Sequence, residues 1–179
     1  MRENPPVSPW LVLSFGVFAI STGAIFARMA EAHPLVISAY RTGLAVLILL
    51  PFTAAGTFRE ARKLSRTDLL TIAVSGGFLA LHFATWISSL FYTSVASSVV
   101  IVNAIPLWTG LLSPLLTGDP FSRSLRRGLL LALPGGAIIG WGDFALGGAA
   151  LWGDFLALLG SFFAALYILA GRRVRPRVS

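Results

Sequence analysis

The sequence contains no cysteine, a single lysine beside 13 arginines, and only two histidines, His33 and His82. The lack of cysteine excludes disulfide bonds and thiolate metal sites. The long apolar segments have no acidic residue near their middle, which disfavours a carboxylate relay inside them. With no metal-ligand spacing, phosphate loop or nucleophile–base pair, the sequence disfavours an enzyme and predicts neither a cofactor nor a metal.

What the sequence does contain is apolar residues, which make up 56% of its 179 positions, against 12% charged residues and a mean hydropathy of +0.81. Such a composition is too apolar for a soluble domain. The apolar segments are about 20 residues long, as transmembrane helices require, and they lack the alternating polarity of membrane strands. The sequence therefore predicts an all-α, polytopic membrane helix bundle in contact with the lipid bilayer.

Polar interruptions divide the chain into six expected transmembrane helices. We expect these spans at residues 10–30, 35–55, 69–91, 95–117, 128–143 and 151–171. The third and fourth are joined only by the short turn 92–94, so they form a hairpin. The fifth is short and rich in glycine.

Basic residues alternate between the loops and so predict the orientation. One set of loops carries 12 Lys and Arg residues and the opposite set carries none. Cytoplasmic loops retain such cations, so both termini are expected in the cytoplasm, and the abundant arginine favours a bacterial inner membrane. The net charge of +7 therefore reflects membrane topology, and no nucleic-acid partner is expected.

The first and sixth spans align when Arg28 is set against Arg172. Gly16 then matches Gly160 and Phe18 matches Phe162. Five spans separate the equivalent positions, so a repeated unit would be inverted in the membrane, as in many secondary transporters. Alternatively, any two apolar helices that end in arginine align this well.

Several loose motifs follow one another along the chain. They are Pro34 with Arg41 seven positions later, the run from Leu90 to Ser94 with Ala96 and Ser97, Pro106, Gly118-Asp119, the short span from Gly128 to Gly140, and the segment from Gly153 to Arg173. In this order and spacing they resemble the EamA-type transporters of the drug/metabolite transporter superfamily. Asp119 departs from the family pattern, which usually has Glu at this place.

The resemblance implies ten helices in two inverted repeats that move small metabolites or drug-like molecules. Residues 1–143 would form the first five-helix repeat, and residues 144–179 the first helix of an incomplete second repeat. A facilitator or exchanger fits better than an antiporter, in a truncated or partial form that needs the missing second-half helices or a second copy. The alternatives are a noncatalytic membrane assembly subunit and a half-transporter that must dimerise.

Polar residues of the third span share one helical face: His82, Trp86, Ser89 and Thr93 follow each other at helical spacing. His82 falls near the middle of its span, where a polar group usually faces a cavity or a helical partner. We interpret His82, Trp86 and Ser89 as candidate substrate-binding residues, with His82 also able to respond to protons. The alternative is a neutral histidine bonded to a neighbouring helix, with Trp86 packing only.

Two further places carry candidate binding residues. Pro106 cannot donate to the carbonyl of Val102, so the fourth span should bend beside Asn103 and expose polar backbone to a cavity. The alternative is a structural kink with Asn103 bonding between helices. Tyr40 and Arg41 could form an electropositive vestibule for anionic or zwitterionic substrates, unless Arg41 extends to the outer interface.

Overall fold

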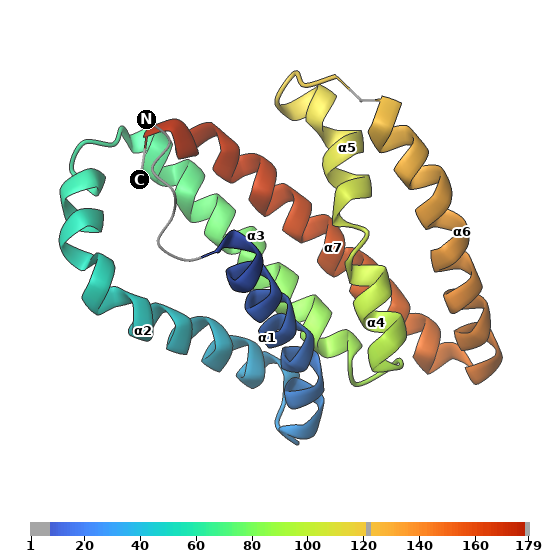
Figure 1. Cartoon of the computed structure of the whole chain (residues 1–179). Helices are drawn as coiled ribbons and strands as arrows, with labels where there is room; N and C mark the ends of the chain where they lie inside the picture. Colours follow the sequence, from blue (N-terminus) through green and yellow to red (C-terminus); the bar gives the residue numbers. More distant parts are fainter. Residues whose placement is uncertain (1–7, 121–122, 178–179) are drawn as a thin grey trace.

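The computed structural model describes residues 8–120 and 123–177, and this part of the chain folds entirely into helices and short connections (Figure 1). The predicted all-α class is confirmed. The N-terminal polar segment with Arg2 lies outside the described residues. The helices are α1 (Pro9–Met29), α2 (Pro34–Ala61), α3 (Arg66–Ser89), α4 (Val95–Val102), α5 (Ile105–Leu116), α6 (Arg123–Leu146), α7 (Gly148–Val174) and the 3-10 turn η1 (Arg175–Arg177).

Five helical segments of the described chain are long and apolar enough to cross a membrane. They are α1, the first 21 residues of α2, α3, the α4–α5 pair and α7 with η1. The remaining expected span lies within α6, which has 24 residues but is not among these five. Its first turns carry Arg123 and Arg127, and its interior contains Pro134, so it is less apolar than the others.

Local sequence signals explain where several helices begin. Proline occupies the first turn of α1, α2 and α5, where its missing N–H costs nothing. Helix α3 begins with a capping box, in which the Ser65 side chain accepts from the Asp68 backbone and Asp68 accepts from the Ser65 backbone. Helix α2 continues to Ala61, beyond its expected end at 55, because residues 57–61 still favour helix.

Helices α3 and α7 make the most extensive contact in the described chain, and Figure 1 shows them crossing the molecule side by side. The buried face of α7 consists of small residues at helical spacing, among them Gly153, Ala157, Gly160 and Ala164. Small side chains let two backbones approach closely in a membrane. A Cβ atom at Gly153 would lie only 2.7 Å from the Thr93 nitrogen, so this approach requires glycine.

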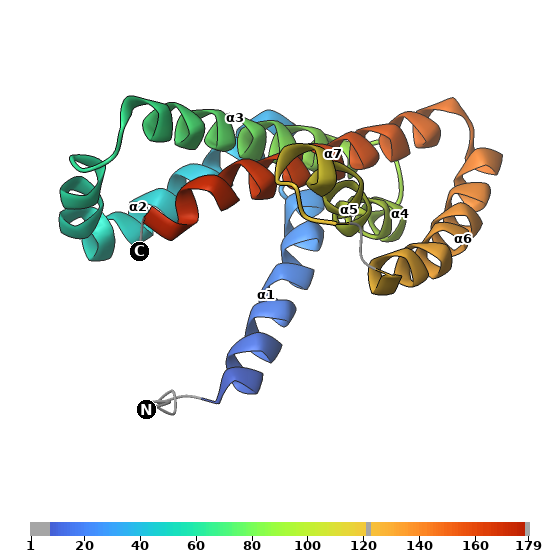
Figure 2. The same cartoon turned by 90° about the horizontal axis from the view of Figure 1, so that it is seen from above.

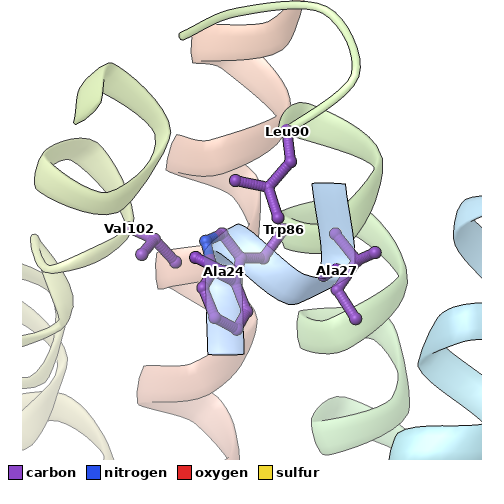
Figure 3. Packing of buried hydrophobic residues seen from close by; sticks show 6 residues of the cluster. Ala24, Ala27, Trp86, Leu90 and Val102 are labelled. Atoms are coloured by element: carbon purple, nitrogen blue, oxygen red, sulfur yellow. The ribbon is translucent and has the colours of Figure 1, made fainter. Parts of the chain in front are cut away.

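Helix α1 packs on the other elements through a small apolar cluster. Ala24 and Ala27 of α1 meet Trp86 and Leu90 of the α3 region and Val102 of α4 (Figure 3). Elsewhere α1 leans away from the layer that contains α3 and α7 (Figure 2). Only 11% of the α1 span and 6% of the α2 span are buried, so both helices present large apolar faces to their surroundings.

The basic segments meet at one end of the helices. Arg177 bonds to Asp68 in the first turn of α3, and Arg172 pairs with Asp119 of the α5–α6 connection at 2.9 Å. At the other end, Thr93 donates to Asp154 at 2.9 Å and Arg28 donates to the carbonyl of Leu90. The structure thus gathers three of the cationic segments on one side of the bundle.

Candidate functional site

A cavity of about 440 Å³ lies between α1, α2, α3 and α4. Arg41, His82, Trp86 and Asn103 all line it, although they come from α2, from α3 and from the break between α4 and α5. Apolar side chains of α1 and α4 make up most of the remaining wall. The structure therefore brings four of the predicted binding residues together around one space.

His82 is held by the α3–α7 contact. The residue is 9% exposed, and its Nδ1 atom lies 2.9 Å from the carbonyl oxygen of Gly160. A carbonyl can only accept, so Nδ1 carries the hydrogen, and in the neutral ring Nε2 then carries the lone pair. The ring also stacks on Trp86, with 5.8 Å between the ring centroids. His82 thus bonds to a neighbouring helix and lines the cavity at the same time.

Trp86 contributes a hydrogen-bond donor that has no acceptor. The residue is 7% exposed, and its Nε1 is the one buried side-chain nitrogen or oxygen without a partner in the described part of the chain. Figure 3 shows this nitrogen on the side of the ring that faces Val102 of α4. A buried donor without a partner costs about 1–3 kcal/mol, so its presence in a cavity wall requires an explanation.

Arg41 reaches the same cavity from α2. Its guanidinium carbon lies 5.0 Å from the ring centroid of Phe83 and 5.4 Å from that of Trp86. A Cβ atom at Gly23 of α1 would approach the Arg41 Nη1 atom to 3.3 Å, so glycine leaves space for the side chain. No described acidic side chain forms an ion pair with Arg41. Its interactions in this region are cation–π contacts.

Asn103 stands at a break in the predicted fourth span. Helix α4 ends at Val102 and α5 begins at Ile105, and Pro106 in the first turn of α5 has no N–H for the Val102 carbonyl. The Asn103 Nδ2 donates to the carbonyl of Val99 at 2.7 Å. Because Nδ2 is used inside its own helix, Oδ1 remains as an acceptor at the exposed, cavity-lining end of the side chain.

The other candidate residues lie outside this cavity. Ser89 is fully buried, donates to the carbonyl of Trp86, and lies 2.6 Å from the Ser98 hydroxyl of α4. Its hydroxyl thereby ties α3 to α4. Tyr40 is 66% exposed on the outside of α2.

Pro106 lines a second cavity of about 550 Å³ between α5, α6 and α7, at the end where Arg172 pairs with Asp119. Ile105 lines both cavities. The first residue of α5 therefore lies between them.

Sequence reasoning missed several cavity-lining residues. Phe83 lies three positions before Trp86, so helical spacing along α3 could have identified it. Ser21 and Ala24 of α1 carry no comparable signal, because their place depends on how α1 packs. In the part of the chain that the structure describes, no group of three His, Asp or Glu side chains could hold a metal ion.

One known protein family matches most of the chain. The model of the EamA-like transporter family matches residues 8–141, from the start of α1 into α6. Comparisons with curated proteins and with solved structures found no match. The matched region covers most of the chain and contains every residue that lines the cavity around Trp86. The chain therefore belongs to the EamA-like transporter family, whose members are membrane transporters of small molecules.

Proposed function

We propose that this chain works as a facilitator or exchanger that moves small metabolites or drug-like organic molecules across a cell membrane. The observation that carries the proposal is the meeting of Arg41, His82, Trp86 and Asn103 around one cavity inside an apolar bundle. Ionisable and polar groups are costly in such a place and commonly mark a substrate pathway. These four residues are the proposed substrate-binding residues.

The two cavities suggest a route for the substrate. One is lined by the proposed binding residues, the other by Pro106 and by the Asp119–Arg172 pair, and Ile105 belongs to both walls. We assign Ile105, beside the break between α4 and α5, as the barrier between the two spaces. A broken helix at this depth can move without disrupting a continuous hydrogen-bond ladder.

Additional helices complete the cavity in this proposal. Residues 1–143 form a first repeat and residues 144–179 begin a second, and the end of the family match at residue 141 supports this division. Only 11% of the α1 span and 6% of the α2 span are buried. Their exposed apolar faces support a contact with second-half helices or with a second copy. The transporter is then a partial form of a ten-helix, inverted-repeat architecture.

The same proposal places both termini in the cytoplasm and the protein in a bacterial inner membrane. The contacts of Arg172 with Asp119 and of Arg177 with Asp68 support this orientation, because they gather the cationic segments at one end. A noncatalytic membrane assembly subunit is the alternative function.

The experiment is solute exchange in proteoliposomes that contain the purified chain. The liposomes are loaded in turn with a panel of unlabelled amino acids, monocarboxylates and nucleobases, and entry of the same labelled solutes is measured. We expect saturable exchange of at least one class. Ile105→Trp should abolish this exchange by filling the barrier, whereas Leu111→Trp, on an exposed face of α5, should leave it unchanged.

Saturable exchange that survives Ile105→Trp would contradict the proposed route. A folded protein that exchanges none of these solutes would overturn transport by this chain and favour the assembly subunit. Folding of each variant is checked by its elution from a sizing column in detergent.

A further inference from the structure

We propose that Arg41 and the indole N–H of Trp86 together bind the carboxylate of a singly charged organic substrate. This inference rests on the proposed transport function and names the chemical group that the cavity recognises. Its basis is the presence, in one cavity wall, of a cation without an anion and of a buried donor without an acceptor.

The first part of the argument concerns the charge of Arg41. A guanidinium in an apolar surrounding is stable only when paired, and among the described residues no carboxylate pairs with it. The rings of Phe83 and Trp86 hold its position, at 5.0 and 5.4 Å from their centroids, but they do not neutralise its charge. The cavity therefore presents one fixed positive charge to whatever enters it.

The second part concerns Trp86, which is more than nine-tenths buried. Its Nε1–H is buried and has no acceptor among the described residues, and Trp86 lines the same cavity as Arg41. Apolar packing needs a ring at this position but no N–H, since phenylalanine has no donor to leave unpaired. A ligand oxygen would satisfy this donor.

The third part concerns the kind of anion. A carboxylate has two oxygen atoms, so one can accept from the guanidinium and the other from the indole. A phosphate monoester carries a charge close to −2 at neutral pH, which one guanidinium would leave partly uncompensated in an apolar space. The single charge of Arg41 thus favours a carboxylate over a phosphate.

Two further lining residues, Asn103 and His82, limit what the rest of the substrate can be. The Asn103 Oδ1 and, in the neutral ring, the His82 Nε2 can each accept a hydrogen bond. A second anionic group would find no further fixed positive charge among the lining residues, whereas an N–H or O–H group would find an acceptor. We therefore expect monocarboxylates, with or without such a donor, and not dicarboxylates.

The test measures binding to the purified chain in detergent by isothermal titration with benzoate, benzamide, phthalate and phenylphosphonate. Benzamide has nearly the shape of benzoate without its charge, and phthalate adds a second carboxylate. We expect benzoate to bind at least about 10-fold more tightly than each of the other three probes, since 10-fold corresponds to about 1.4 kcal/mol, no more than one charged hydrogen bond contributes. Equal affinity for benzoate and benzamide would overturn the proposal.

Two variants test whether Arg41 and the Trp86 N–H cause the preference for benzoate. Arg41→Gln should remove the preference for benzoate over benzamide, whereas Arg59→Gln, an exposed arginine on the same helix, should keep it. Trp86→Phe should weaken benzoate binding about 3- to 10-fold while keeping the ring. Trp141→Phe, at an indole that is 83% exposed, is the matched control.

A double-mutant cycle then asks whether both groups hold the same carboxylate. The two losses in benzoate affinity should be non-additive, because each variant alone already removes part of one shared contact. Additive losses, or no effect of Trp86→Phe in a protein that elutes normally, would contradict the two-donor site. Solute exchange without carboxylate preference would overturn this inference alone, whereas carboxylate binding without exchange would overturn only the proposed function.

Discussion

At the scale of single residues, the polar face of α3 divides into groups that are satisfied within the fold and one that is not. Ser89 and His82 both have partners on neighbouring helices, Ser98 and Gly160. Trp86, which lies between them in the sequence, keeps a free N–H. Helical spacing puts all three residues on one face, so spacing alone cannot tell which polar group forms a hydrogen bond within the fold. The residues packed against each of them decide this.

The bond from His82 to Gly160 should stabilise the contact between α3 and α7. His82→Phe keeps an aromatic ring beside Trp86 but removes the Nδ1–H donor. We expect the free energy of unfolding to fall by about 0.6–1.7 kcal/mol, the range for hydrogen bonds between membrane helices. Unfolding by titration with sodium dodecyl sulfate measures it. An unchanged unfolding midpoint would show that this bond does not stabilise the helix pair.

At the scale of elements, small residues determine how α7 packs on α3. Gly160 lies against Trp86 and Gly153 against Thr93, and an added Cβ atom would approach those residues to 3.2 and 2.7 Å. The equivalent residue in the proposed repeat, Gly16 of α1, has no atom within 4 Å of such a Cβ. Glycine is therefore required for close packing in α7, whereas Gly16 in α1 has room for a side chain.

This difference predicts position-dependent effects of alanine along α7. Gly153→Ala should lower the free energy of unfolding by about 1–3 kcal/mol, because the new Cβ collides with the backbone of Thr93. Gly171→Ala should be neutral or stabilising, since its Cβ would meet Ser75 at an ordinary 3.7 Å and alanine favours helix. Thermal unfolding in detergent compares the two. Equal destabilisation would contradict the close approach at Gly153.

At the scale of the whole molecule, charge and apolar surface are separated. The basic segments and their acidic partners Asp68 and Asp119 gather at one end of the bundle, and large apolar side chains cover α1 and α2. This distribution fits a protein that crosses a bilayer with its cationic end on one side. Part of the wall of the cavity around Trp86 comes from α1 and α2, of which little is buried against the rest of the fold.

The proposed orientation can be measured because the chain has no cysteine of its own. Thr67→Cys places a thiol at the cationic end and Tyr92→Cys places one in the turn between α3 and α4, and both positions are exposed. In intact bacterial cells, a membrane-impermeant maleimide should label Tyr92→Cys only. After the membrane is opened, both should react. Labelling of Thr67→Cys in intact cells would reverse the proposed topology.

The sequence by itself determined the helical membrane class, most helix positions and the bend beside Pro106, because hydropathy, span length and a missing N–H act locally along the chain. It also placed His82, Trp86 and Ser89 on one face. Tertiary structure alone decided that Ser89 is sealed against Ser98 while Trp86 lines a cavity with Arg41. Such pairings depend on how closely helices approach one another, and that distance is set by side chains far apart in the sequence, such as Gly23 beside Arg41 and Gly160 beside Trp86.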